Sequence, residues 1–351
     1  MNLFPRLVLS FSAVAAALLA CGQKAGTRYE PRPIGFYNLE NLYDTLKGRN
    51  DDAEYQPGSA KQWGTERYQR KLQHLAKALG EMGTDVQPDG LVCFGMCEVE
   101  TRGVVEDLLH TPPLAKRGYR IVHHDSPDRR GVDVAFAYNP NYFTLLHERK
   151  YRLSDPQDTT FRTRDQLVVS GLMDGDTVSI IVNHWPSRFG GEKISLPRRI
   201  LAARLGRHII DSLLARNADA RILYMGDLND DPVDPSVRKF LGTTGNKEDV
   251  SAKKLYNPMY GLFRKGIGTL AWRDSWNLFD QIILSPGLVT GAGGNLRFYG
   301  ARVFNQPYLR QTEGNFAGYP LRTYVGDTYQ GGYSDHFPVY VILVKEVKEA
   351  K

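Results

Sequence analysis

The stretch ARILYMGDLND (220–230) constrains the fold of this chain more than any other. Its apolar residues predict a buried strand, and Gly226 allows the backbone to lie close to a neighbouring group. Because side chains alternate along a strand, we expect Asp227 and Asn229 to point the same way. A carboxylate beside an amide suits a divalent cation or a phosphoryl oxygen, although a turn rich in Asp and Asn would close a strand with the same residues.

Short apolar runs of this kind recur along the chain and predict a protein rich in strands. Apolar residues recur at helical spacing after Thr65, after Thr101 and over 197–215. Neighbouring runs are separated by turn residues and predict hairpins, whereas 242–274 and 286–332 are expected to be irregular. We therefore expect an α/β fold in which two packed, mostly antiparallel β-sheets are flanked by helices. The predicted strands lie in 33–44, 91–100, 119–125, 131–140, 143–153, 161–173, 177–188, 222–226, 276–285 and 333–343.

The chain begins with a segment typical of a secretory signal peptide. Arg6 precedes the apolar run Leu7–Ala20, which is too short for a typical membrane-spanning helix. Cys21 follows Leu-Leu-Ala, a pattern that resembles the lipobox of bacterial lipoproteins, in which the cysteine is lipidated after cleavage. We expect a signal peptide over 1–20 and an exported lipoprotein anchored through Cys21, on the periplasmic face or the outer membrane. A conventional secretory cleavage and an uncleaved anchor are the alternatives.

The remaining residues are expected to form one domain over 32–346, after a polar tether at 21–31 and before a tail at 347–351. With 42% hydrophobic and 24% charged residues in a chain of 351, the composition is that of an ordinary globular protein. The net charge of +6 gives a mild preference for phosphate-bearing partners. Cys93 and Cys97 would lie about 13 Å apart in an extended strand, which is too far for a disulfide, so we expect two buried thiols.

Polar residues gather in or at the ends of the predicted strands, where sheet proteins keep their functional sites. Many of these residues are acidic and have no matching lysine, so they would repel one another unless a cation or a phosphate-binding arrangement is present. The residues are Asn38, Glu40, Glu98, Asp133, His184, Asp227, Asn229, Asp280, Asp335 and His336.

These residues lie in motifs that resemble those of the endonuclease/exonuclease/phosphatase superfamily. That group contains pancreatic-type deoxyribonuclease, abasic-site endonucleases, sphingomyelinases and inositol-polyphosphate 5-phosphatases. The motifs, in order, are FYNLENLYD, MCEVE, VNHWPSR, MGDLND, FDQIILS and YSDHFPV. Their order and strand settings fit over nearly all of 33–345. The resemblance implies a four-layer, deoxyribonuclease-like α/β sandwich and a metal-dependent hydrolase that acts on phosphoric esters.

The resemblance also implies a metal site. Glu98 resembles the principal Mg²⁺ ligand of the superfamily, and Asn38, Glu40 and Asp335 would lie near the ion. Such oxygen ligands favour Mg²⁺ or Mn²⁺, and Ca²⁺ also fits. Glu40 occupies a place where some relatives have Asp.

Five further residues are implied to carry the chemistry. His336, oriented by Asp280, would handle the nucleophilic water or stabilise the phosphorane, and Asp227 is the competing candidate for the base. Asn229 would hold the water or a phosphoryl oxygen. His184 resembles the acid on the leaving-group side, although a hydrogen-bonded structural histidine would fit the same context.

Three arginines, Arg130, Arg164 and Arg188, are candidate contacts for the substrate phosphate. Exposed arginines on strands are more often solvated than functional. Asp133 has a similar ambiguity, because it is either a site residue near Arg130 or a member of a buried ion pair.

Together these features predict an exported, membrane-tethered endonuclease that acts as a monomer on nucleic acid or another phosphodiester. Arginine and aromatic residues over 295–330 would allow contacts with the backbone and stacking on the bases of a nucleic acid. A phosphatase or phospholipase C-like enzyme acting on inositol or sphingolipid phosphates is one alternative. A catalytically inactive binding lipoprotein is another, although the complete set of polar residues argues against it.

Overall fold

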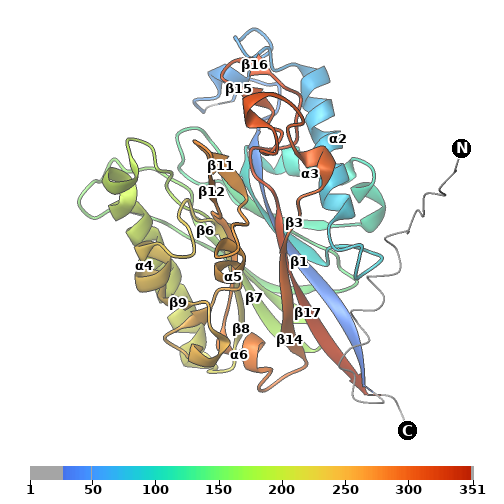
Figure 1. Cartoon of the computed structure of the whole chain (residues 1–351), viewed down its shortest axis with the longest axis vertical. Helices are drawn as coiled ribbons and strands as arrows, with labels where there is room; N and C mark the ends of the chain where they lie inside the picture. The colour runs from blue at the N-terminus through green and yellow to red at the C-terminus, as the bar shows by residue number, and fades with distance from the viewer. Residues whose placement is uncertain (1–26, 49, 349–351) are drawn as a thin grey trace, which may run out of the picture.

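The computed structural model describes residues 27–48 and 50–348, which form four layers (Figure 1). Two large β-sheets pack face to face. Helices α2 (Thr65–Glu81) and α3 (Arg102–His110) cover the outer face of one sheet, and α4 (Glu192–Arg216) covers the outer face of the other. This is the arrangement expected from the sequence. The predicted signal peptide and Cys21 lie outside the described residues.

Both sheets are mixed but mostly antiparallel. Among the described residues, the six strands of the first sheet are, in order, β14 (Leu296–Val303), β17 (Val339–Lys348), β1 (Thr27–Leu42), β2 (Cys93–Val99), β4 (Asp133–Tyr138) and β3 (Arg120–His123). In the same part of the chain, the seven strands of the second sheet are β5 (Thr144–Tyr151), β6 (Gln166–Met173), β7 (Asp176–His184), β8 (Arg221–Asp227), β13 (Asp280–Leu284), β10 (Leu255–Tyr256) and β9 (Thr243–Thr244).

Shorter elements connect and extend these layers. Two hairpins, β11–β12 and β15–β16, form two-stranded sheets of their own, separate from the large sheets. The shorter elements are α5 (Met259–Phe263), α6 (Pro286–Thr290), β11 (Leu270–Trp272), β12 (Ser275–Asn277), β15 (Tyr324–Val325), β16 (Thr328–Tyr329), the 3-10 helices η2 (Ala53–Tyr55), η3 (Leu114–Arg117), η5 (Lys247–Asp249), η6 (Pro307–Leu309) and η7 (Gly314–Phe316), and the π-helix η4 (Ser236–Gly242).

Central strands are buried on both faces, which explains why their sequences read as continuous apolar runs. In β8, Leu223 and Met225 pack between the two sheets, whereas Ile222 and Tyr224 pack under α4. The two cysteines of β2 face the core between the sheets and are free thiols, as predicted. No helix in the described part of the chain is long and apolar enough to cross a membrane.

The first strand begins earlier than the sequence indicates. β1 starts at Thr27 and pairs with β17 from there to Phe36, so residues 27–31 belong to the sheet and not to the predicted tether. β17 likewise continues to Lys348, into the predicted tail. Pro31 and Pro33 conceal this strand in the sequence. Both are tolerated because they precede Ile34, where β2 begins to pair with β1, so the segment is an edge there.

Two other elements also differ from the expectation. β14 is a strand with one register shift, between Phe298 and Gly300, inside the stretch expected to be irregular. α4 begins at Glu192, one turn earlier than the predicted start at Pro197, which lies inside the helix. The added turn is held by Arg199, whose guanidinium donates to the carbonyl of Glu192 at 2.9 Å and to Oγ of Ser195 at 2.7 Å.

Candidate active site

Five strands bring polar residues to the same edge of the two sheets. β1 and β2 run parallel and carry Asn38 and Glu98 near their carboxyl ends. β7 and β8 also run parallel and end at His184 and Asp227, which are paired in register. The antiparallel strand β13 starts at Asp280, opposite Asp227. Because parallel strands finish at a common edge, these five side chains gather in one place.

Asp227 lies at the centre of this group. Its Oδ2 accepts a hydrogen bond from Nδ2 of Asn38 at 3.0 Å, and lies 3.7 Å from Nε2 of His184 and 3.9 Å from Nε2 of His336. Its Oδ1 accepts from the backbone N–H of Asn229 at 2.9 Å. Predicted site residues from four separate parts of the chain therefore meet around one carboxylate.

Glu98 adds a second carboxylate beside the first. Its Oε1 lies 3.7 Å from Nε2 of His184 and 3.5 Å from Nδ2 of Asn38. Its Oε2 accepts from the backbone N–H of Asn41 at 2.9 Å. One nitrogen of His184 therefore faces both Glu98 and Asp227, which places the two acids close together.

The backbone around the site adopts unusual conformations. Glu40, Asn41, Glu98 and Asn229 have φ angles of 49°, 53°, 61° and 50°, which lie in the left-handed region. Each such residue costs on the order of 1–3 kcal/mol and persists only where the surrounding structure fixes it. The register of β1 against β2 shifts just after Asn38, so the strained residues re-aim the chain at the strand ends. A cluster of this kind is typical of functional sites.

His336 comes from the loop before β17 and is held from two sides. Its Nδ1 lies 2.6 Å from Oδ2 of Asp280, which is fully buried. Its backbone N–H donates to Oγ of Ser334 at 3.1 Å, and that hydroxyl donates to the carbonyl of Asn38 at 2.7 Å. Because a carboxylate can only accept, Nδ1 carries a proton and Nε2 is the atom that faces Asp227.

Burial and neighbouring charges shift the pKa values of the two histidines in opposite directions. Burial lowers the pKa of His184 well below its usual value, and nearby arginines act in the same direction. Burial also opposes protonation of His336, but the carboxylates of Asp280 and Asp227 raise its pKa well above the usual value. Burial raises the pKa of Asp227 to about 7, although His336 acts in the opposite direction. Near neutral pH the site therefore combines a neutral imidazole, a cationic imidazole and a carboxylate that can exchange a proton.

Asn229 reaches the site through its backbone. β8 ends at Asp227, so the side-chain alternation expected for Asp227 and Asn229 does not continue past the strand. The side-chain amide of Asn229 instead donates to the carbonyl of Trp185 at 3.0 Å. The left-handed conformation of Asn229 turns the chain away from the extended path on which that alternation depends. The hydrogen bond from the backbone N–H of Asn229 to Oδ1 of Asp227 keeps Asn229 beside that carboxylate.

Asp335 lies at the rim of the group. Its Oδ1 is 3.9 Å from Nε2 of His336, and its Oδ2 pairs with Nη2 of Arg322 at 3.1 Å. The side chain of Asp335 is 29% exposed, whereas those of Glu40 and Glu98 are 9% and 13% exposed. Asp335 is therefore the most accessible of these three predicted metal ligands.

Glu40 has a different environment from the one expected. Its Oε2 accepts from the backbone N–H and the hydroxyl of Thr323, both at 2.7 Å, and pairs with Nζ of Lys71 at 3.4 Å. Nζ of Lys71 also donates to the hydroxyl of Thr323 and to the carbonyl of Tyr333. The structure therefore gives Glu40 a lysine partner, so its carboxylate is already paired within the protein.

Arg188 does not offer its guanidinium to a phosphate. Its Nε donates to the carbonyl of Asn229 at 2.9 Å, and its Nη2 pairs with Asp230 at 3.1 Å and with Asp234 at 2.7 Å. Its donors are thus used within the protein. The acidic run that follows the Asp227 motif therefore neutralises Arg188, which leaves it poorly suited to the predicted phosphate contact.

The other two arginines also differ from each other. Arg164 is buried, pairs with Asp128 at 3.0 Å and donates to the carbonyl of Trp185 at 2.6 Å, so its role is to hold two loops together. Arg130 is 45% exposed and its Nη1 lies 3.5 Å from Oδ1 of Asn41, whose backbone N–H binds Glu98. Arg130 is therefore the predicted phosphate contact whose placement suits that role.

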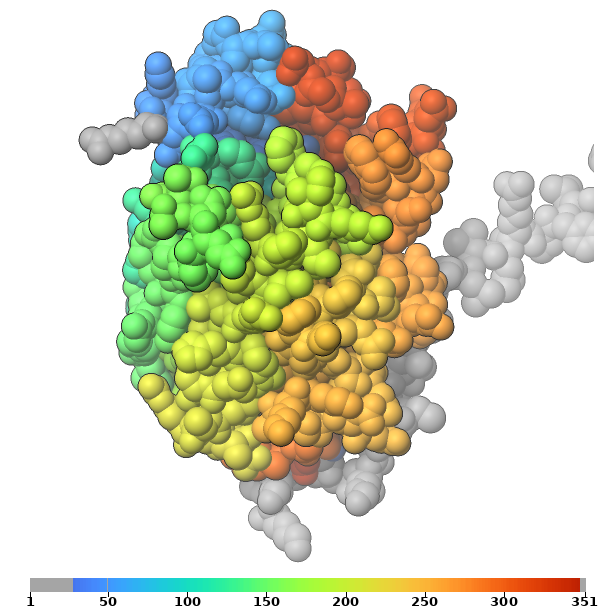
Figure 2. All heavy atoms as spheres, turned by 90° about the vertical axis from the view of Figure 1, so that its left-hand side faces the viewer, coloured from blue at the N-terminus to red at the C-terminus, as the bar shows by residue number. Residues whose placement is uncertain are grey.

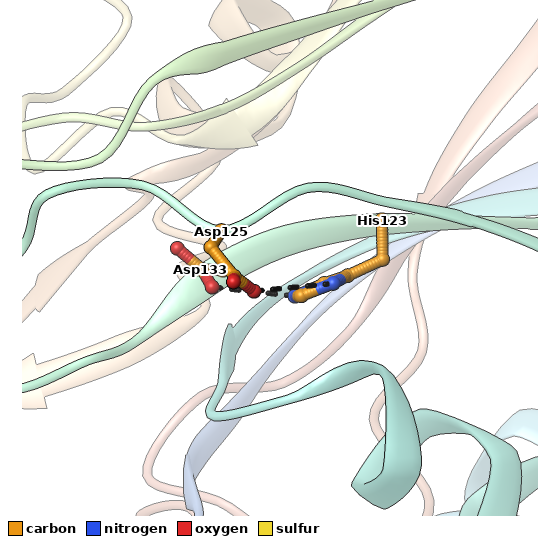
Figure 3. Close-up of side chains that lie close together, drawn as sticks. All are labelled: His123, Asp125 and Asp133. Carbon is orange, nitrogen blue, oxygen red and sulfur yellow. Dashed lines mark ion pairs between the residues drawn. The ribbon is translucent and has the colours of Figure 1, made fainter. Parts of the chain in front are cut away.

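Asp133 belongs to a separate group, shown in Figure 3. Its Oδ2 lies 3.3 Å from Nε2 of His123, whose Nδ1 lies 4.0 Å from Asp125. Its Oδ1 accepts from the backbone N–H of Ser126 at 2.8 Å. Of the two interpretations of Asp133, the structure favours the buried ion pair, because both carboxylate oxygens already have partners in the protein.

The sequence profile of the endonuclease/exonuclease/phosphatase family matches residues 33–345. The chain belongs to this family. It is a hydrolase of the family and acts on phosphoric esters. No curated protein matches it in sequence.

Several solved structures share this fold. A humanised TDP2 of D. rerio is 12% identical with a TM-score of 0.52, and the match covers 89% of this chain and 98% of that one. A family protein of Bacteroides thetaiotaomicron is 18% identical with a TM-score of 0.51, covering 92% of this chain and 98% of the other. The mannosyl-6-phosphatase Bt3783 of the same organism is 18% identical with a TM-score of 0.51, covering 90% and 99%. These similarities establish the two-sheet fold.

Members of this family are typically metal-dependent, and the acidic group fits a hard cation. Within the described residues, neither Glu98 nor Asp227 forms an ion pair with a lysine or an arginine. Their oxygens, with Asn38 and Asp335 alongside, could therefore hold a divalent ion. Asp227, Asp280 and His336 also offer atoms within 4.8 Å of one another, although Nδ1 of His336 is in short contact with Oδ2 of Asp280.

Three residues that contact the site are not among those predicted from the sequence. Lys71 lies on the inner face of α2, one turn after Tyr68 and one before Leu75, and a charged residue on an apolar face is a signal that could have found it. Thr323 and Arg322 lie in a stretch without periodicity, where no local pattern predicts contacts with β1 or with Asp335.

Proposed function

We propose that this chain is a metal-dependent phosphodiesterase that cleaves nucleic acid. The observation that carries the proposal is the carboxylate of Asp227 facing two imidazoles, His184 at 3.7 Å and His336 at 3.9 Å, beside Glu98. Hydrolysis of a diester requires one group that accepts the proton of water and another that supports the leaving oxygen. An acid that faces two differently charged imidazoles supplies groups for both tasks.

Each residue then has a distinct task. Glu98, with Asn38 and Asp335, would hold the cation, which neutralises charge on the phosphoryl group when bound. Asp227 accepts the proton of the attacking water, because its carboxylate has no lysine or arginine partner among the described residues. His336, fixed by Asp280, directs Nε2 toward the phosphoryl oxygens. His184 faces the leaving-group side and, because burial keeps its imidazole neutral, donates a hydrogen bond there and not a proton.

The similar structures indicate which substrates should be compared. TDP2 of D. rerio was crystallised with a single-strand DNA product, whereas Bt3783 is named as a mannosyl-6-phosphatase. For this chain we favour nucleic acid, because the net charge of +6 and the arginine and aromatic residues after position 295 suit a polyanion with stacked rings.

An activity panel tests the proposal. Single-stranded DNA, plasmid DNA, RNA, sphingomyelin, inositol phosphates and sugar phosphates are each incubated with Mg²⁺, Mn²⁺, Ca²⁺ or a chelator. We expect strand cleavage with Mg²⁺ or Mn²⁺ that His336→Ala slows by about 10² to 10⁴, the usual contribution of a general acid or base. His110→Ala, at the exposed end of α3, is the matched control and should be unaffected.

The panel also identifies the alternatives. Release of inorganic phosphate from monoesters alone would replace the nuclease by a phosphatase. Cleavage of sphingomyelin alone would indicate a phospholipase C-like enzyme. Inactivity on every substrate would leave a binding lipoprotein.

We further propose that the chain is exported and anchored to a membrane as a monomer through lipid on Cys21. The support is the sequence alone, in which an apolar run ends in Leu-Leu-Ala before this cysteine. Metabolic labelling with a radioactive fatty acid should label the wild-type chain and not Cys21→Ser, and the variant should leave the membrane fraction. Labelling that persists in the variant would reject this anchor.

A further inference from the structure

A pocket of about 320 Å³ borders the site beside Asp335. Its walls come from the β11–β12 hairpin and from residues 311–325. Trp272 and Phe316 line it from opposite segments and are 67% and 50% exposed. Large apolar side chains at such exposure, gathered around one hollow, are typical of a binding surface.

The two walls are fastened to each other. The hydroxyl of Tyr319 donates to Oδ1 of Asp274 at 2.6 Å and accepts from the backbone N–H of Asp274 at 2.8 Å. The ring of Tyr319 also packs against Phe316 at 5.6 Å and against Trp276 at 5.8 Å between centroids. In Figure 2 the orange and red segments that contain these residues lie side by side at the upper right. The pocket is therefore preformed.

The hairpin is also attached to the active site. The carbonyl of Thr269, at the base of the hairpin, accepts from the N–H of Phe337 at 2.7 Å, and its hydroxyl accepts from the N–H of Asp280 at 3.5 Å. Asp335 lines the pocket while its Oδ1 lies 3.9 Å from Nε2 of His336. A substrate held at His336 would therefore extend into this pocket.

Polar groups in the pocket indicate what kind of ligand it takes. Arg322 pairs with Asp335 at 3.1 Å yet stays 43% exposed, and the guanidinium of Arg273 lies 5.6 Å from the ring of Trp272. Gln311 also lines the pocket, and its Oε1 accepts no hydrogen bond from the described residues. Aromatic faces, two cations and a side-chain amide together match a planar ring with polar edges joined to a phosphate.

We propose that this pocket binds a nucleobase adjacent to the scissile phosphate. The proposal rests on the proposed function, because it names the part of a nucleic acid that the site would grip. Stacking suits every base, since each has a π-face. An acyl chain would fill the same volume but has neither charge nor hydrogen-bonding groups to match the guanidinium groups and the amide.

A binding measurement tests the pocket without depending on turnover. The full-length chain is titrated, with a chelator present, with a single-stranded oligothymidylate and with the same sugar-phosphate strand lacking bases. Tryptophan fluorescence and anisotropy report binding. We expect the wild type to bind the base-bearing strand about tenfold more tightly, the ratio that one stacked base provides, with quenching of tryptophan emission.

Three variants locate the effect. Trp272→Ala should abolish the preference for bases, Trp272→Phe should keep most of it, and Leu146→Ala, at a half-exposed apolar residue of β5 outside the pocket, should leave it unchanged. Equal binding of the two strands by the wild type, or a preference that survives in Trp272→Ala, overturns the proposal. Binding of sphingomyelin vesicles that depends on Trp272 overturns it as well. A base preference that depends on Trp272 in a chain that cleaves no diester supports the pocket and rejects the nuclease.

Discussion

Glu40 and Asp227 are both carboxylates at strand ends, yet their surroundings separate them. Glu40 is paired with Lys71, which is 1% exposed and also binds two groups of the loop that precedes Asp335. Asp227 faces two histidines and has no lysine or arginine partner among the described residues. The first arrangement fixes a loop, whereas the second leaves a carboxylate available for chemistry.

Replacing Asp227 by Asn should stabilise the metal-free protein at high pH. Burial raises the pKa of Asp227 to about 7, so the folded state holds a proton that the unfolded chain releases near pH 3.9. The stabilisation from this proton is complete below about pH 3.9 and is lost as the pH rises through about 7. Asn does not ionise, so the free energy of unfolding of the variant should exceed that of the wild type by up to roughly 4 kcal/mol at high pH.

Denaturant unfolding in a chelator, at several values between pH 4 and pH 8, measures this difference. The two proteins should converge at the acidic end. A difference that does not change with pH would show that Asp227 is not held in the protonated form by burial.

Replacing Lys71 by Met should destabilise the fold by about 3–5 kcal/mol, because it leaves the buried carboxylate of Glu40 without its partner. The double variant Lys71→Met with Glu40→Gln should recover a large part of the loss. Thermal unfolding measures both. Lys116→Met, on the exposed surface, is the control, and equal stability of Lys71→Met and Lys116→Met would contradict the assignment.

Strand ends decide where the site forms, and the parallel pairs β1–β2 and β7–β8 make those ends coincide. The backbone of β7 and β8 must approach closely for this. A Cβ on Gly226 would lie 2.3 Å from the carbonyl oxygen of Asn183, so no side chain fits there. The glycine before Asp227 predicts this close approach.

Gly226→Ala should therefore lower the stability by about 1–3 kcal/mol, as overpacking a core does, and should reduce activity because it displaces Asp227. Gly103→Ala on α3 is the matched control. That position is exposed, and its new Cβ would meet nothing closer than 3.4 Å, so we expect a gain of up to about 1 kcal/mol. Comparable unfolding temperatures for the two variants would reject the close approach.

Elements with strong local signals could be predicted from the sequence, and those without them could not. The hairpin of β6 and β7 and the capped helix after Thr101 follow from alternation and from a capping hydroxyl, which here accepts from the N–H of Val104. β14 alternates in burial but contains arginines and a glycine, so its pairing with β17 depends on residues far along the chain.

The candidate site shows the same limit. The motifs indicated that Asn38, Glu98, Asp227 and His336 would gather, and the strand ends bring them together. The sequence could not indicate that Arg188 would form ion pairs with Asp230 and Asp234. Ion pairs depend on side chains that meet only after folding, and a single sequence does not reveal them.

Across the whole molecule, two sheets place acids, amides and imidazoles from both halves of the chain at one edge, with an aromatic pocket alongside. The catalytic group and the pocket share the segment from Thr269 to Asp280 and the loop that ends at His336. The proposed base pocket and the candidate active site would therefore be coupled through short contacts.

The most direct test of this account is the rate of cleavage of a defined single-stranded DNA during a Mg²⁺ titration. The wild-type rate should rise with Mg²⁺ to a plateau and vanish with a chelator. Glu98→Gln should cut the plateau rate by about 10² to 10³, the usual cost of losing one group that stabilises transition-state charge, whereas Glu346→Gln on the exposed side of β17 should not. Cleavage that ignores Mg²⁺, or a Glu98→Gln protein as active as the wild type, would contradict the account.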